Sequence, residues 1–298
     1  MRRRPRARAG WQPGLRPWWF LLPLLLLIAL FILLPVLGTF GTSFHEDTAF
    51  RGRSFNGLAN YLHALRDAGF WQSLTFTLLF VLVSVPLELI LGLGFALLLD
   101  RALPWRPLLR VCLLIPWAIP AAISARTWEL IYNYQYGLAN YILRSLGLID
   151  APINWLGSDV SAFFCVVIPD VWRTAPFAAI IFLAGLQAIP RQLYAQARVD
   201  GAHFLQVFWR ITLPLLRPVL IVALLFRTID ALRVFDPIYV ITGGGPGGAT
   251  TSLSLFAYDY FASGDFGYGA CISMWLFVIA LVLALIYVRA ARFAAEAT

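Results

Sequence analysis

The segment YAQARVDGAHFLQVFWRITLP, residues 194–214, decides how this chain is interpreted. It is polar and carries arginines, yet it lies between two strongly apolar runs. The pattern predicts a short helix over residues 191–200, a sharp bend that Gly201 permits, and a second short helix over about residues 202–210. Because Pro214 leads into the next apolar run, the two short helices are expected to project from a membrane surface.

The composition is typical of a membrane protein and excludes an ordinary soluble domain. The chain has 298 residues, of which 60% are hydrophobic, and its mean hydropathy is +0.77. Runs of about 20 apolar residues cross a hydrocarbon core of about 30 Å. Six such segments are predicted, at about residues 18–40, 73–99, 111–132, 162–188, 215–241 and 266–288. We therefore predict an all-α, polytopic bundle of about six transmembrane helices over residues 18–298, after an arginine-rich tail of residues 1–17.

The arginines are distributed unequally between the two sides of the predicted membrane. The chain has 23 arginines and no lysine. The N-terminal tail holds six, the second-to-third link three, the fourth-to-fifth link four and the C-terminal end two, against four in the opposite loops. Cytoplasmic loops collect basic residues, so both termini and the polar segment, residues 189–214, are predicted to face the cytoplasm. The tail is expected to contact anionic lipid rather than nucleic acid.

The absence of lysine excludes a nucleotide-binding loop of the Walker A type, which needs a lysine on the phosphates. If ATP drives the protein, a separate polypeptide must bind the ATP and its magnesium, and this chain binds no cofactor. Cys112, Cys165 and Cys271 lack the spacing of metal ligands and are interpreted as small hydrophobes. With scattered histidines and no nucleophile–base constellation, the chain is predicted to have neither a metal site nor catalytic residues, and not to be an enzyme.

The core of the polar segment reads A-Q-A-x3-G-x9-I-x-L-P and resembles the signature E-A-A-x3-G-x9-I-x-L-P of ABC importer inner-membrane permeases. The resemblance implies that residues 189–214 contact the ATPase, and they are here named the coupling loop. Residues 114–143, 171–194 and 226–250 resemble the maltose, trehalose and glycerol-phosphate class of this family. The resemblance covers most of residues 70–290 and implies the first permease of a heterodimeric pair. It implies ATP-driven import of a sugar by alternating access, with a di- or oligosaccharide such as trehalose or maltose as the substrate.

The same resemblance implies a set of partners and a location. The partners are a second homologous permease, two ABC ATPase subunits, an extracytoplasmic sugar-binding protein, the sugar itself and the lipid bilayer. The location is the inner membrane of a bacterial or archaeal cell. An ion-gradient-driven secondary transporter of a polar solute stays open as the alternative, because charged residues inside a span can serve proton coupling.

In the family this loop docks on the ATPase, so the resemblance assigns coupling to its central residues. One position departs from the pattern, because Ala195 stands where the family has glutamate. A salt bridge from this position is therefore excluded, and either Asp200 or Gln196 takes over or the contact rests on shape and apolar packing. The predicted coupling residues are Tyr194, Gln196, Ala197, Asp200, Gly201 and Ala202.

Charged residues recur every three positions in the predicted fifth span, at Arg227, Asp230, Arg233 and Asp236. Ionisable groups at bilayer depth usually face the bundle interior or a cavity, and neighbours at i and i+3 can neutralise each other. Both a structural ladder and a sugar site are open, since guanidinium and carboxylate groups bind hydroxyls. Glu88 is expected to be a buried partner between helices. The predicted substrate-binding residues are Asp230, Arg233, Asp236, Tyr239, Phe235, Arg173 and Trp172.

Overall fold

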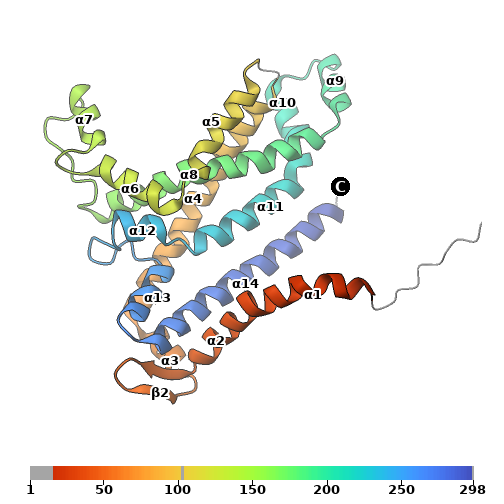
Figure 1. Ribbon diagram of the computed structural model, residues 1–298. Helices are drawn as coiled ribbons and strands as arrows, with labels where there is room; N and C mark the ends of the chain where they lie inside the picture. Colours follow the sequence, from red (N-terminus) through yellow and green to blue (C-terminus); the bar gives the residue numbers. More distant parts are fainter. Residues whose placement is uncertain (1–15, 102–103, 297–298) are drawn as a thin grey trace, which may run out of the picture.

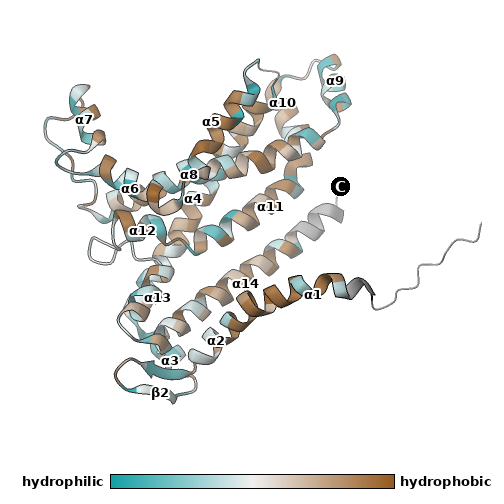
Figure 2. Ribbon diagram, in the orientation of Figure 1, coloured by the Kyte–Doolittle hydropathy of each residue, from teal (hydrophilic) through white to brown (hydrophobic). Residues whose placement is uncertain are grey.

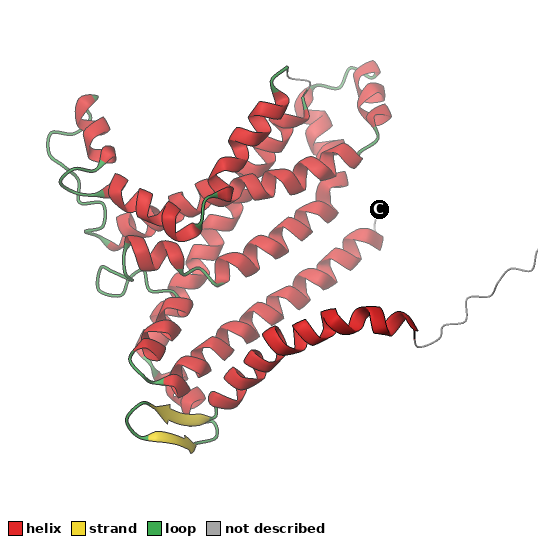
Figure 3. Cartoon of the chain, in the orientation of Figure 1, coloured by secondary structure: helices red, strands yellow, loops and turns green. Residues whose placement is uncertain are grey.

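The computed structural model describes residues 16–101 and 104–296, and most of them are helical (Figures 1 and 3). Most of the predicted arginine-rich tail, residues 1–17, lies outside the described residues. In chain order the elements are α1 (Arg16–Ile28), the π-helix η1 (Ala29–Leu33), α2 (Leu34–Thr42), β1 (His45–Thr48), β2 (Gly52–Phe55), α3 (Ala59–Arg66), α4 (Ala68–Asp100), α5 (Arg106–Ala118), α6 (Ala121–Tyr132), α7 (Leu138–Ser145), α8 (Asp159–Ala188), α9 (Arg191–Val199), α10 (Phe204–Val207), the π-helix η2 (Phe208–Thr212), α11 (Leu213–Leu232), α12 (Asp236–Ile241), α13 (Leu253–Ala262) and α14 (Phe266–Glu296).

Four helical segments are long and apolar enough to cross a membrane, namely Trp19–Thr42, α4, α8 and α14. The predicted span at residues 111–132 is not one straight helix. It is divided between α5 and α6, which bend by 89° at Ile119 and Pro120. The residue before a proline avoids the α conformation, and Ile119 is extended with ψ 130°. Counting this bent pair as one span gives five.

The predicted span at residues 215–241 is also interrupted. α11 is a helix of 20 residues that ends at Leu232, and α12 begins only at Asp236. Pro237 lies in the first turn of α12. Backbone N–H groups in the first turn have no partner within the helix, so a proline there costs no hydrogen bond. The charges at intervals of three therefore do not lie on one continuous helix, and the prediction that they do is wrong. Asp230 stays on α11, whereas Asp236 begins the next helix.

The interior of the bundle is built around the contact between α4 and α8, on which α11 also packs. Phe80 of α4 and Phe182 of α8 are fully buried there. The two helices approach closely because Gly92 has no side chain: a Cβ at this position would lie 2.7 Å from the Cβ of Ala178. Small residues at such crossings let membrane helices pack backbone to backbone.

The outer surface of the bundle is apolar, as Figure 2 shows for α1 and α14. The segment Trp19–Thr42 buries none of the residues in its most apolar stretch within the described chain, and Leu22, Leu26 and Leu30 are all exposed. This helix lies at the edge of the bundle, with α2 against α14 (Figure 1). A soluble protein rarely exposes so long an apolar face, so lipid or another membrane subunit must cover it.

The two ends of the bundle differ (Figure 1). One end carries α9, α10, the start of α5 and the C-terminal end of α14, which are the segments where the arginines gather. The other end carries α3, α6, α7, α12 and α13, together with a short hairpin in which β1 pairs antiparallel with β2. The chain is thus a helical membrane bundle, as predicted, with this hairpin as an addition that the sequence did not indicate.

Candidate functional site

The coupling loop forms two short helices at one end of the bundle, as predicted. α9 spans Arg191–Val199, with Asp200 as its C-cap, and is followed by a left-handed residue, Gly201, with φ +72°. Ala202 N donates to Ala197 O at 2.9 Å and Gly201 N donates to Arg198 O at 3.1 Å. This pair of hydrogen bonds is the Schellman motif, in which glycine adopts the left-handed position without the clash of a Cβ. The second helix is shorter than predicted, since α10 covers only Phe204–Val207 before η2 begins.

The predicted coupling residues divide into two groups by exposure. Gln196, Asp200 and Gly201 are exposed and available to a partner, and so is Ala195. Ala197 is buried, while Tyr194 and Ala202 are half-buried against the bundle. The hydroxyl of Tyr194 lies 3.3 Å from the Thr212 hydroxyl and so joins the two ends of the loop. These last residues hold the loop to the bundle rather than presenting a surface.

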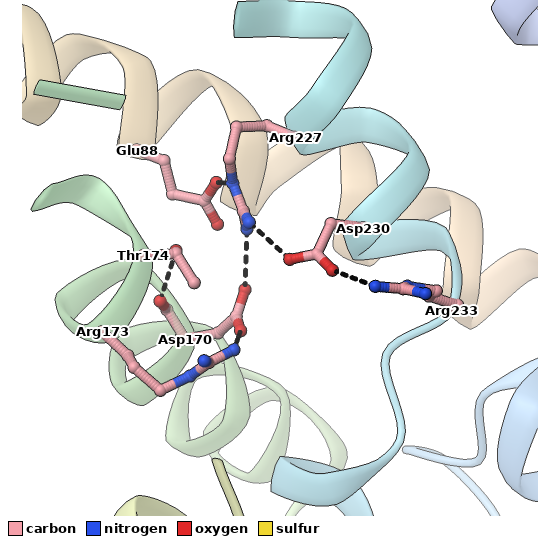
Figure 4. Close-up of polar contacts among 7 residues, drawn as sticks. All are labelled: Glu88, Asp170, Arg173, Thr174, Arg227, Asp230 and Arg233. Carbon is pink, nitrogen blue, oxygen red and sulfur yellow. Dashed lines mark hydrogen bonds and ion pairs between the residues drawn. The ribbon is translucent and has the colours of Figure 1, made fainter. Parts of the chain in front are cut away.

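A cluster of six charged residues joins α4, α8 and α11 inside the bundle, and Arg227 is its centre (Figure 4). Arg227 Nε donates to Glu88 Oε2 at 2.5 Å, and its Nη1 donates to Asp230 Oδ2 at 2.6 Å. Its Nη2 lies 3.7 Å from Asp170 Oδ2. One guanidinium therefore faces three carboxylates from three helices. A charge at this depth is tolerated only when it is paired in this way.

The cluster leads from the closed interior to an open surface. The side chains of Glu88, Arg227 and Asp170 are at most 6% exposed, whereas Asp230 is 41% and Arg233 72% exposed. Arg233 Nη2 donates to Asp230 Oδ1 at 3.1 Å. Arg173 Nη2 lies 3.6 Å from Asp170 Oδ1. The buried end thus has excess carboxylate, and the two remaining guanidinium groups balance it at the open end.

A cavity of about 300 Å³ opens at this end of the cluster. Three acids and three arginines line it, so its formal charges cancel. This volume is at the lower end of the range for small-molecule sites, about 300–1,000 Å³. Its lining residues are Asp170, Arg173, Arg227, Asp230, Ala231, Arg233, Val234, Phe235, Asp236 and Pro237.

The structure brings together most, but not all, of the predicted substrate-binding residues. Five of the predicted residues line the cavity: Arg173, Asp230, Arg233, Phe235 and Asp236. Tyr239 does not line the cavity; its ring stacks on Phe235 with centroids 5.3 Å apart, and the two rings form one aromatic wall. Trp172 points elsewhere, because it lines a separate apolar pocket and contacts Trp128 edge to face at 5.8 Å.

Two carboxylates that sequence reasoning left out of the candidate site belong to the cluster. Glu88 was expected to be a buried partner between helices, and it is one, but its partner on α11 could not be named from the sequence. Asp170 bridges Arg227 and Arg173. The available signal was an acid at bilayer depth, in α4 for Glu88 and in α8 for Asp170. What the sequence lacked was the crossing of α4, α8 and α11.

Residues 68–294 match the family described as the binding-protein-dependent transport system inner membrane component. The chain belongs to this family. The match runs from the start of α4 to the last turns of α14, so it includes both the coupling loop and the charge cluster. The resemblance drawn from the coupling loop is thereby confirmed, and the chain is a multi-pass ABC importer permease.

Named relatives of this permease cover almost its whole length. It is 57% identical over 274 residues to the trehalose/maltose transport system permease of Thermococcus litoralis, with 92% of each chain covered. It is 39% identical to the sulfoquinovosyl glycerol permease of Agrobacterium fabrum, covering 91% of this chain and 89% of the relative. It is 38% identical to the trehalose permease of Mycobacterium tuberculosis, covering 82% and 76%.

Solved structures support the same fold for the permease. A chain from a bacterial ABC transporter that imports alginate superposes with a TM-score of 0.80, at 23% identity, and the match covers 93% of this chain and 95% of that one. A chain of an amino acid ABC transporter superposes with a TM-score of 0.53, covering 78% and 97%. At this level of identity the likeness concerns the arrangement of helices.

Proposed function

We propose that the permease carries a neutral disaccharide of the trehalose or maltose type across the membrane, with ATP as the energy source. The observation that supports this most directly is the cavity beside Arg227, with its balanced acids and arginines. A hydroxyl group both donates and accepts hydrogen bonds, so a neutral polyol finds donors in Arg173 and Arg233 and acceptors in Asp230 and Asp236. The wall formed by Phe235 and Tyr239 offers an apolar face for a sugar ring.

The balance of charge favours a neutral sugar over an anionic one. An acidic substrate would be favoured by arginines in excess of carboxylates, whereas three acids here oppose three arginines. The names of two relatives, one at 57% and one at 38% identity, point to trehalose or maltose. Both lines support the same substrate class.

The remaining subunits of the transporter are part of the proposal. The permease pairs with a second homologous permease and two ATPase subunits, which dock on the exposed face of α9. An extracytoplasmic binding protein delivers the sugar at the opposite end. The coupling loop and both termini face the cytoplasm, since the arginines gather at that end of the bundle. ATP hydrolysis belongs to the ATPase subunits, because this chain has no lysine for a Walker A loop.

Uptake of radiolabelled trehalose and maltose into proteoliposomes tests the proposal. The complete transporter is reconstituted with its binding protein, with ATP or a non-hydrolysable analogue on the ATPase side. We expect uptake of trehalose or maltose that requires both ATP and the binding protein. Sulfoquinovosyl glycerol, which carries a negative charge, should not be taken up. Uptake by this permease alone under an ion gradient, without the ATPase, would instead establish the ion-driven alternative.

A further inference from the structure

A second polar cavity lies at the end of the bundle that carries the coupling loop, far from the charge cluster. Its volume is about 680 Å³, and it opens between the end of α4, the start of α5, the end of α8 and the coupling loop. We propose that this cavity binds the phosphate group of an anionic ligand, either a phospholipid headgroup or a free phosphate. This site is independent of the sugar that the permease carries.

The lining of the second cavity is strongly basic. Among the described residues that line it, Asp100 is the one acid, so positive charges exceed negative charges by three. Asp100 Oδ1 lies 3.9 Å from Arg106 Nη2, farther than the 2.7–2.9 Å typical of a charge-assisted hydrogen bond. Like charges held in a concave surface raise the local concentration of anions. The lining arginines are Arg101, Arg106, Arg191 and Arg198.

A neutral amide joins two guanidinium groups beside this cavity, one on Arg106 of the lining and one on Arg110, a turn further along α5. The neighbours of Gln187 orient its amide so that the oxygen accepts from Arg106 Nη2 at 3.0 Å and from Arg110 Nη2 at 3.2 Å. The Nε atoms of Arg106 and Arg110 are buried and have no hydrogen-bond partner among the described residues. A neutral amide holds the two cations together, but it neutralises neither. Buried donors of this kind call for an acceptor.

A phosphate group fits these requirements better than a carboxylate does. The planar guanidinium presents its donors as a fork that matches phosphate oxygens, and a phosphate has enough oxygens for several arginines at once. Apart from Gln187 and Thr212, the rest of the lining is apolar or aromatic, with Leu97, Leu186 and Phe208 beside the arginines. A phospholipid would therefore find polar contacts for its headgroup and apolar contacts for its glycerol ester region at one place.

Occupation of this cavity would act on the coupling loop. Arg191 and Arg198 belong to α9, and Tyr194 and Phe208 line the cavity from the two ends of the loop. An anion bridging these arginines to Arg101 and Arg106 would tie α9 to the ends of α4 and α5. The loop would then move with the bundle as one body, and the anion would strengthen the link between ATPase and membrane helices.

Binding measurements on the full chain, purified in an uncharged detergent, test the proposal in two arms. The first titrates inorganic phosphate by calorimetry at constant ionic strength, with chloride as the reference. The second compares adducts of phosphatidylglycerol and phosphatidylcholine by native mass spectrometry. The cavity variant is Arg101→Gln/Arg106→Gln. The control, Arg217→Gln/Arg289→Gln, removes the same charge at the same end of the bundle from exposed positions outside the cavity.

We expect the cavity variant to weaken binding about tenfold, equivalent to 1.4 kcal/mol, while the control binds as the wild type does. The arm in which the difference appears identifies the source of the phosphate. Arg198→Gln, on exposed α9, should weaken the same arm and serves if the double variant does not fold. Absence of binding in both arms, or equal loss in the cavity and control variants, would overturn the proposal.

Discussion

Glu88 on α4 and Arg227 on α11 lie 139 positions apart in the chain, yet Glu88 Oε2 accepts from Arg227 Nε at 2.5 Å. Both side chains are almost completely removed from solvent, at 0% and 3% exposed. Removing one member of such a pair leaves an uncompensated buried charge. The pair therefore joins α4 to α11 and orients Arg227 so that its Nη1 reaches Asp230 at the edge of the cavity.

Replacing Glu88 with alanine should destabilise the permease by about 3–5 kcal/mol, because Arg227 loses its closest carboxylate. Glu88→Gln should cost less, since its amide oxygen still accepts the hydrogen bond. Thermal unfolding of the purified complex measures both. The matched control is Glu129→Gln, which breaks the ion pair of Glu129 with the largely exposed Arg126. Exposed pairs contribute only about 0–1 kcal/mol, so this variant should unfold close to the wild type.

A double variant separates the pair from its surroundings. Glu88→Leu/Arg227→Met removes both charges and keeps apolar volume, so it should recover much of the stability that Glu88→Leu loses. Recovery is not expected to be complete, since Asp170 and Asp230 then lack Arg227. If the loss of unfolding free energy in the double variant equalled the sum of the losses in Glu88→Leu and Arg227→Met, the two side chains would not be coupled, contrary to the geometry.

Arg233→Ala should impair sugar transport without unfolding the permease. The Arg233 side chain is 72% exposed at the cavity, and within the described residues it donates a hydrogen bond to Asp230. A hydrogen bond from a charged group contributes about 1.5–3 kcal/mol, so the sugar concentration for half-maximal uptake should rise about tenfold or more. Arg144→Ala, at an exposed position of α7 outside the cavity, is the control. Unchanged uptake kinetics in Arg233→Ala would leave Arg233 a structural role only.

The sequence indicated this fold more fully than it indicated the site. Hydropathy predicted every long helix, and the spacing from Ala195 to Pro214 predicted the coupling loop with its bend at Gly201. Local patterns extend over a few turns, however, and the partner of Arg227 lies on another helix. The even spacing from Arg227 to Asp236 suggested one helix, whereas the chain leaves the helical path after Leu232. Which charges meet is decided by how helices cross, and periodicity does not contain that information.

Replacing Gly201 should disturb coupling between ATP hydrolysis and uptake. The residue has φ +72°, and no atom lies within 4 Å of a Cβ built there. A bulky side chain is therefore not blocked within the chain, but the left-handed backbone disfavours it by about 1–2 kcal/mol. Gly201→Trp should insert normally, yet hydrolyse ATP with little uptake, because the bend and the exposed face of α9 both change.

The control for that variant is Gly201→Asn, since asparagine adopts the left-handed conformation more readily than other residues do. In Gly201→Asn the ratio of ATP hydrolysed to sugar taken up, measured in proteoliposomes, should stay near the wild-type value. Wild-type coupling in Gly201→Trp would mean that neither the bend nor the face beside it transmits motion from the ATPase.

Two glycines on α4 give a matched pair for the contact with α8. A Cβ at Gly92 would lie 2.7 Å from the Ala178 Cβ and 3.0 Å from the Ala179 backbone nitrogen, so neither α8 nor α4 can yield without moving backbone. Gly92→Ala should therefore destabilise the bundle by about 1–3 kcal/mol, as overpacking does. At Gly94, half a turn away, no atom lies within 4 Å of such a Cβ. Gly94→Ala should leave stability unchanged or raise it by up to about 1 kcal/mol, because alanine favours the helix. The measurement is the unfolding temperature of the two variants side by side.

Because Glu88 lies one turn before Gly92 on α4, a displaced α4 would also move the Glu88 carboxylate away from Arg227. Gly92→Ala, but not Gly94→Ala, should therefore lower sugar uptake as well. Equal stability and equal uptake in the two variants would show that α4 and α8 do not approach as closely as Gly92 permits.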